Sequence, residues 1–99
     1  MNYRKWTVTV TRRAVKQLEK LPLSIQERFD LLAKEIEVAG PMRSNWKNFG
    51  MLRGAGNVRL YHCHLKSGRP TYVVCWEVIS KVICLVEVYY VGTHEKAPY

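Results

Sequence analysis

The stretch TYVVCWEVISKVICLVEVYYVG, residues 71–92, decides the fold of this 99-residue chain. Within it, residues 71–78 and 82–91 are rich in β-branched and aromatic side chains, which is typical of strands. The three residues between these runs suit a hairpin connection. A further strand is predicted at residues 57–65, separated from the next one by the turn-forming sequence Lys66-Ser-Gly-Arg-Pro70. We therefore expect the C-terminal half to form an antiparallel meander.

The N-terminal half predicts one strand followed by two helices. Residues 6–10 alternate β-branched side chains and predict the strand. Thr11 caps the first helix and Pro22 stops it. Ser24 and Glu27 have the spacing of a capping box for the second helix. The apolar stripe of that helix recurs at helical spacing and consists of Ile25, Phe29, Leu32 and Ile36.

This order of elements predicts an α+β fold, β-α-α-β-β-β, in a single domain that spans residues 1–99. The second helix ends at Gly40-Pro41, and residues 41–56 are expected to be irregular. Two helices joined by so short a connection pack antiparallel, and we expect them to cover one face of a small, largely antiparallel sheet. The other face is then partly open.

The charge of the chain favours a polyanionic partner. The formal net charge is +8, and residues 43–69 contain six Lys or Arg and no acidic residue. Such a run attracts phosphate backbones. The three cysteines lie inside apolar strand-like runs and are expected to be buried, reduced thiols. Neither a signal-peptide core nor a membrane-spanning run is recognisable, so we expect a cytoplasmic protein that does not bind a membrane.

The segment that follows the last predicted strand carries candidate reactive groups. His94, Glu95, Lys96 and Tyr99 span the acid–base range that proton transfer at a phosphate ester requires. Cleavage of RNA by its 2′-hydroxyl needs a base, an acid and cations that stabilise the phosphorane, and these can be supplied by side chains without a metal. Histidine is the natural proton shuttle near neutral pH.

The predicted strand at 57–65 carries the other two histidines. Because side chains alternate along a strand, His62 and His64 share one face, whereas Arg59 points to the other unless a bulge intervenes. We expect the histidines, with Arg59 as the alternative, to face the site. A metal site formed by these histidines with His94 is not favoured, and no small-molecule cofactor is expected.

Several motifs together resemble the RelE/ParE superfamily of bacterial toxins, over nearly the whole chain. They are the strand–helix–helix start, Leu18-Glu-Lys-Leu-Pro22, Leu52-Arg-Gly54 before the meander, and the Gly92-x-His94…Tyr99 ending. The resemblance implies a small basic toxin held inactive by a cognate antitoxin. RelE-like members cut messenger RNA in the ribosomal A site, whereas ParE-like members inhibit DNA gyrase without nuclease chemistry.

The resemblance also implies site residues. His94 falls at the basic position after the last strand, and Tyr99 at or next to the C-terminal tyrosine position. His62 and His64, or else Arg59, fall near the basic positions of the second strand of the fold, predicted at residues 57–65. Many relatives open the third strand with a tyrosine–arginine pair. Here that region reads Arg69-Pro-Thr-Tyr72, so the arginine is either missing or displaced to Arg69.

We therefore favour the RelE-like branch: a ribosome-dependent mRNA endonuclease that inhibits translation by metal-independent acid–base cleavage. The expected catalytic residues are His94, Tyr99, His64, His62 and Lys96. The expected RNA-binding residues are Arg53, Arg59, Lys47 and Arg69. The expected partners are a cognate antitoxin, the ribosome and mRNA. The alternatives are a ParE-like gyrase inhibitor and an inactive relative that binds nucleic acid or antitoxin.

Overall fold

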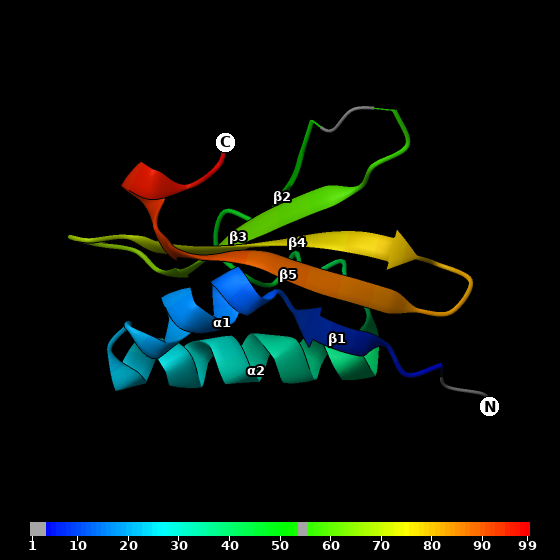
Figure 1. The fold of residues 1–99 in the computed structure, drawn as a ribbon, viewed down its shortest axis with the longest axis horizontal. Helices are drawn as coiled ribbons and strands as arrows, with labels where there is room; N and C mark the ends of the chain where they lie inside the picture. Colours follow the sequence, from blue (N-terminus) through cyan, green and yellow to red (C-terminus); the bar gives the residue numbers. More distant parts are fainter. Residues whose placement is uncertain (1–3, 54–55) are drawn as a thin grey trace.

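Two α-helices and five strands make up the regular structure of the computed structural model, which describes residues 4–53 and 56–99 (Figure 1). In chain order they are β1 (Thr7–Val10), α1 (Arg12–Glu19), α2 (Leu23–Ala39), β2 (Gly50–Leu52), β3 (Leu60–Lys66), β4 (Tyr72–Ser80) and β5 (Leu85–Thr93), followed by the 3₁₀ turn η1 (His94–Lys96). Gly54, which closes the Leu52-Arg-Gly54 motif, lies outside the described residues. None of the helices in the described part has the length and apolar character needed to cross a bilayer.

The strands form one mixed sheet in the order β1-β5-β4-β3-β2. Strand β1 pairs in parallel with β5, in a register that places Thr7 opposite Leu85, and all other pairs are antiparallel. The α+β class and the largely antiparallel meander are thus confirmed. Strand β2 was not predicted, because residues 41–56 were expected to be irregular, and it adds an edge strand of three residues beside β3.

The helices cover one face of this sheet and run in opposite directions (Figure 1). Thr11 caps α1 as predicted, since its hydroxyl oxygen accepts the backbone N–H of Ala14 at 3.1 Å. The prediction of a capping box at Ser24 and Glu27 is wrong. Helix α2 begins two residues earlier than that box requires, with Pro22 in place of Ser24 at its N-cap and no side-chain cap, so Ser24 lies inside the first turn. The backbone N–H groups of Ile25 and of Gln26 donate to the carbonyl of Pro22 instead.

The hydrophobic core lies between the helices and the sheet. The predicted stripe of α2 is buried there in full: Ile25, Phe29, Leu32 and Ile36. Strand β3 contributes Tyr61, Cys63 and Leu65, and β4 contributes Trp76, whose side chain is completely buried. All three cysteines are buried and reduced, as expected.

The opposite face of the sheet is only partly covered. A small cluster of Val73, Cys75 and Tyr90 is buried there, and Ala97 of the C-terminal segment packs against it. In Figure 1 this segment lies above the sheet, on the side away from the helices. Because β3 alternates strictly, His62 and His64 also lie on this face, while their neighbours on the strand enter the core.

The loop between α2 and β2 is fixed to the helix by one carboxylate. Glu35 Oε1 accepts hydrogen bonds from Asn45 Nδ2 at 2.9 Å, from Trp46 Nε1 at 2.9 Å and from Arg43 at 3.3 Å. Burial opposes ionisation of Glu35, but these three donors outweigh it and lower the pKa of the carboxyl group. The loop that leads into β2 therefore has a defined position beside β3.

Candidate functional site

The C-terminal segment is held against the sheet by two hydrogen bonds at the end of β5. The Tyr90 hydroxyl donates to the carbonyl of Thr93 at 2.7 Å, and the backbone N–H of His94 donates to the carbonyl of Thr71 at 2.9 Å. Gly92 makes the first bond possible. A Cβ at that position would lie 2.7 Å from the Tyr90 hydroxyl oxygen, well inside van der Waals contact.

This turn brings three histidines and a tyrosine together on the open face. The ring centroids of His62 and Tyr99 are 4.7 Å apart, and those of His94 and Tyr99 are 5.9 Å apart. His64 meets His94 edge to face, with centroids 5.8 Å apart. Strand β3 thus supplies two rings and the C-terminal segment supplies two, and we call His62, His64, His94 and Tyr99 the histidine cluster.

His62 is the most enclosed member of the cluster. Gly50 on the neighbouring strand gives its ring room, because a Cβ there would lie 3.2 Å from His62 Nε2. His62 Nδ1 is shielded from solvent and has no hydrogen-bonding partner among the described residues. Burial lowers the pKa of His62, and the neighbouring His64 and His94 lower it further, so the neutral imidazole is favoured.

His64 is held at the entrance of the site. Its Nδ1 lies 3.3 Å from the Ser67 hydroxyl oxygen, and its backbone N–H donates to the carbonyl of Lys47 at 2.8 Å. Burial lowers the pKa of His64, and the nearby His94 and Lys47 add to that effect. At neutral pH this imidazole is therefore a proton acceptor.

Tyr99 complements the imidazoles. Its side chain is 47% exposed. Partial burial, with smaller contributions from Cys75 and Cys63, raises the pKa of the phenol. Tyr99 is therefore a protonated hydrogen-bond donor at neutral pH. The cluster combines proton acceptors with a proton donor on one surface, which is the composition that acid–base chemistry needs.

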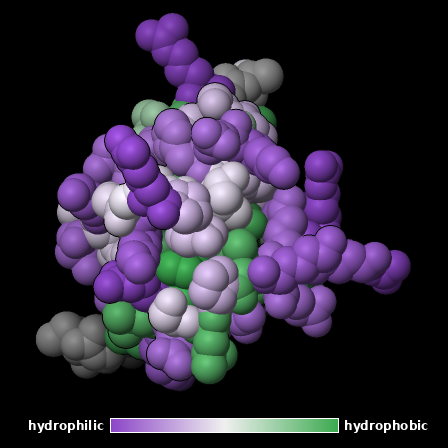
Figure 2. Space-filling model, turned by 90° about the vertical axis from the view of Figure 1, so that its left-hand side faces the viewer, coloured by the Kyte–Doolittle hydropathy of each residue, from purple (hydrophilic) through white to green (hydrophobic). Residues whose placement is uncertain are grey.

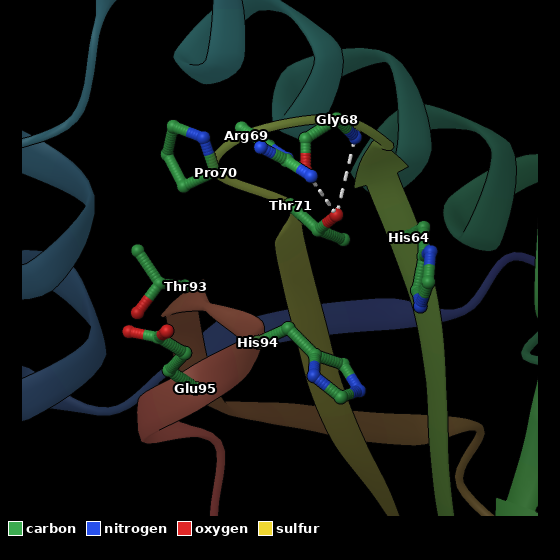
Figure 3. A pocket seen from close by; sticks show the side chains of 8 residues that line it. All are labelled: His64, Gly68, Arg69, Pro70, Thr71, Thr93, His94 and Glu95. Carbon is green, nitrogen blue, oxygen red and sulfur yellow. Dashed lines mark hydrogen bonds between the residues drawn. The ribbon is translucent and has the colours of Figure 1, made fainter.

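A hollow of about 570 Å³ opens beside the cluster, between the β3–β4 turn and η1. His64, Arg69 and His94 contribute to its wall (Figure 3). In Figure 3 the His94 ring is directed toward His64, whereas Glu95 points away from both. The turn above is closed by Thr71, whose hydroxyl accepts the N–H of Gly68 and donates to its carbonyl. The hollow thus combines two imidazoles with one guanidinium group.

The remaining predicted cations divide into two groups. Lys47 lies beside His64, in a shallow surface shared with Arg28 and Lys66, while Lys96 is exposed on η1. None of these cations forms an ion pair with a carboxylate in residues 4–53 or 56–99. Ser67, Arg28 and Lys66 were not predicted as site residues, because their approach to His64 depends on how the β3–β4 turn and α2 meet.

Arg53 and Arg59 are not brought together with the histidines. They line a different hollow with Tyr61, whose side chain is buried on the helix side of the sheet. The alternation along β3 therefore places the histidines on the open face and excludes Arg59 from it. In the described part of the chain, no three His, Cys, Asp or Glu side chains are grouped so that they would hold a metal ion.

The end of the molecule that carries the β3–β4 turn and the C-terminal segment is predominantly hydrophilic. Figure 2, which views this end directly, shows hydrophilic side chains over most of the surface, with a smaller apolar area between them. A polar, cation-rich surface around paired imidazoles suits a ligand that carries phosphate groups.

Comparison with known proteins agrees with this fold. No protein-family model matches the sequence, and no curated protein matches it significantly. Among solved structures, an archaeal RelE–RelB complex from Pyrococcus horikoshii OT3 is similar, with a TM-score of 0.75 and 22% identity over 94% of this chain and 99% of that chain. A mutant of the E. coli toxin RelE in the free state gives a TM-score of 0.69 and 25% identity, over 94% and 87% of the two chains.

A YoeB dimer from Staphylococcus aureus is also similar, with a TM-score of 0.68 and 11% identity over 91% of this chain and 98% of that chain. These proteins match along almost their whole length, so the likeness extends beyond a shared motif. We therefore place the chain in the RelE-like toxin superfamily, in agreement with the resemblance seen in its sequence.

Proposed function

We propose that this protein is the toxin of a type II toxin–antitoxin system and that it cleaves messenger RNA on the ribosome, so that translation stops. The observation that carries the proposal is the convergence of His62, His64, His94 and Tyr99 on the open face of the sheet. A ParE-like inhibitor that only binds its target has no need of paired imidazoles whose pKa values favour the neutral form.

The proposed chemistry is attack of the RNA 2′-oxygen on the adjacent phosphorus. His64, neutral at pH 7, accepts the proton of the 2′-hydroxyl group. His94 lies on the other side of the site and protonates the departing 5′-oxygen. Rings whose centroids are 5.8 Å apart can reach two different oxygens of one phosphodiester. The products are a 2′,3′-cyclic phosphate and a 5′-hydroxyl end.

Cations and hydrogen-bond donors stabilise the charged phosphorane in this scheme. Arg69, on the wall of the hollow, replaces the arginine that relatives place before the following strand. The Tyr99 phenol donates to a phosphate oxygen, and Lys96 adds positive charge from η1. Lys47 and its basic neighbours Arg28 and Lys66 bind the phosphates upstream or downstream of the cleaved bond. No metal ion or cofactor takes part.

An antitoxin is the proposed protein partner. The similar structure from Pyrococcus horikoshii is a RelE–RelB complex, and a basic surface of this kind suits an acidic protein. We expect the pair to act in the cytoplasm, where ribosomes translate. Antitoxin binding would prevent the histidine cluster from reaching the ribosome.

The decisive experiment adds the purified chain to ribosomes that are stalled on a defined mRNA and maps the cut by primer extension. We expect cleavage in the A site that persists in EDTA, and a loss of at least about 100-fold for His94→Ala, since acid–base groups contribute about 10²–10⁴-fold. The His64→Ala variant should behave alike. The matched control is Lys34→Ala, which removes an exposed cation of α2 that forms an ion pair with Glu37.

The alternatives give different results. Intact mRNA together with inhibited DNA supercoiling would establish the ParE-like alternative. Intact mRNA and normal supercoiling would leave an inactive relative that binds nucleic acid or antitoxin. Full cleavage by His94→Ala would show that the histidine cluster is not the site.

A further inference from the structure

A second hollow, of about 600 Å³, lies at the other end of the molecule and on the helix side of the sheet. Its floor is apolar and consists of Trp6, Pro41, Met42, Tyr61, Val78 and Cys84. Three cations complete its lining: Arg4, Arg59 and Lys81. Val78, Lys81 and Cys84 of its lining lie at the β4–β5 hairpin, whereas His94 lies in η1, and in Figure 1 the hairpin and η1 are at opposite ends of β5. The two sites therefore do not overlap.

The backbone around this second hollow is fixed by hydrogen bonds. The N–H of Trp6 donates to the carbonyl of Glu37 at 2.9 Å, and the N–H of Val78 donates to the carbonyl of Arg59 at 3.0 Å. The indole N–H of Trp76 donates to the carbonyl of Pro41 at 3.2 Å. These backbone groups are thus already engaged and do not compete for a ligand, so a ligand that enters the hollow gains mainly from contact with its apolar side chains.

Exposed apolar side chains surround the second hollow. Met42 is 57% exposed, and a neighbouring hollow of about 950 Å³ continues from it to Met51, which is 68% exposed. On the hairpin, Val82 is 76% exposed. Grouped apolar side chains of this size, and methionines in particular, are typical of surfaces that receive a protein partner.

The positive charge at the second hollow favours an acidic partner. Arg4, Arg59 and Lys81 are all exposed, and none of the nine lining residues is acidic. The Arg4 guanidinium also donates to the carbonyl of Val82, which holds it over the hairpin. Exposed positive groups beside an apolar lining complement a peptide in which carboxylates flank an apolar side chain.

The aromatic residues of the floor argue against a nucleic-acid ligand. Stacking on bases needs an exposed ring face. Tyr61 is 6% exposed and stacks on Phe49 inside the core, with ring centroids 5.7 Å apart. Trp6 packs against Gly40, where a Cβ would lie 3.3 Å from its Nε1. These rings form a wall and offer no open stacking surface.

We propose that this second hollow binds an acidic peptide segment, which inserts one bulky apolar side chain against Trp6 and Val78 while its carboxylates pair with Arg4, Arg59 and Lys81. The occupant is a protein segment and not RNA. The proposal does not rest on RNA cleavage, because it uses the opposite face and the opposite end of the sheet from the histidine cluster.

The test is an NMR titration of the ¹⁵N-labelled full chain with the peptide acetyl-Glu-Asp-Leu-Phe-Glu-Asp-amide. We expect shifts of the Trp6 indole signal and of the amides of Val78, Lys81 and Cys84. Raising the salt from about 50 to about 300 mM should weaken binding at least about threefold, since pairs at an exposed rim are screened. The R59A/K81A double variant should raise Kd about tenfold, a loss expected when two rim charges are removed.

The matched control is R13A/K16A, which removes two exposed cations from α1 and should leave Kd unaltered. The ¹⁵N spectrum of each variant checks its fold. Equal binding of a peptide with Ser in place of Leu and Phe would overturn the apolar anchor. Absence of shifts, or shifts confined to the histidine cluster, would refute the proposal that the peptide binds in the second hollow. Displacement of the peptide by hexauridylate would indicate a nucleic-acid site instead.

Discussion

Gly92→Ala tests how the C-terminal segment is positioned. The added Cβ would lie 2.7 Å from the Tyr90 hydroxyl oxygen and 3.0 Å from Cζ of the same ring, whereas ordinary contact begins at 3.4 Å. The ring must therefore move by about 0.7 Å at its tip. Tyr90 is only 8% exposed and packs against Val73 and Cys75, so the movement disturbs a closed cluster.

Two contributions set the size of the effect. Overpacking of this kind costs about 1–3 kcal/mol. Displacement of the ring also breaks the hydrogen bond of 2.7 Å to the carbonyl of Thr93, which contributes about 1 kcal/mol. We expect Gly92→Ala to lower the free energy of unfolding by about 2–4 kcal/mol. His94 follows Thr93 directly, so mRNA cleavage should fall even at temperatures where the variant is folded.

A double-mutant cycle with Tyr90→Phe tests whether the Tyr90 hydroxyl group causes this loss of stability. The single Tyr90→Phe variant should lose about 1 kcal/mol. In the Y90F background, the added cost of Gly92→Ala should be smaller by at least about 1 kcal/mol, because the closest contact and the hydrogen bond are already gone. Urea unfolding followed by tryptophan fluorescence measures all four proteins. Additive losses would refute the steric argument, as would a Gly92→Ala variant of unaltered stability.

Three further outcomes are expected. The pKa values of His62 and His64 are lowered from 6.5 in the folded state. As the pH falls, the unfolded chain therefore takes up protons at these two imidazoles before the folded chain does, and the folded state loses stability. The urea midpoint should then decrease as the pH falls from 7.5 to about 5, and the dependence should shrink in the H62Q/H64Q variant. Glu35→Ala removes the acceptor of three hydrogen bonds. It should lower the free energy of unfolding by about 2–3 kcal/mol, measured by thermal unfolding, and a loss below 0.5 kcal/mol would contradict that role. Burial raises the pKa of Cys63 and of Cys75 to about 12. Both thiols should react with Ellman's reagent only slowly at pH 8 and rapidly in 6 M guanidinium, and rapid reaction of the native protein would contradict their burial.

The parts of the fold that the sequence predicted are those where one periodicity determines the result. The stripe of α2 entered the core in full, and the alternation along β3 placed His62 and His64 on the face opposite Tyr61. Short capping motifs predicted the helix boundaries less well. Ser24 and Glu27 have the spacing of a capping box, but the helix starts two residues earlier, because the carbonyl of Pro22 accepts its first backbone hydrogen bonds.

Other features depend on contacts between distant segments, which a local pattern does not reveal. Strand β2 has only three residues and begins with Gly50, so it has no recognisable alternation and exists because β3 pairs with it. Ser67 and Arg28 approach His64 from a turn and from a helix, respectively. The parallel pairing of β1 with β5 likewise follows from how the helices cross the sheet.

The parallel pairing of β1 with β5 determines when the sheet can close as the chain folds during translation. Thr7 is paired with Leu85, so β1 waits for 78 further residues to be translated before it can join the sheet. Contacts so distant along the chain slow folding, and the exposed edge of β1 meanwhile favours capture by another strand or a chaperone. The segment that bears His94 leaves the ribosome immediately after β5. A nascent chain therefore acquires its closed sheet and its terminal imidazole almost together, and a chain interrupted before residue 85 has neither.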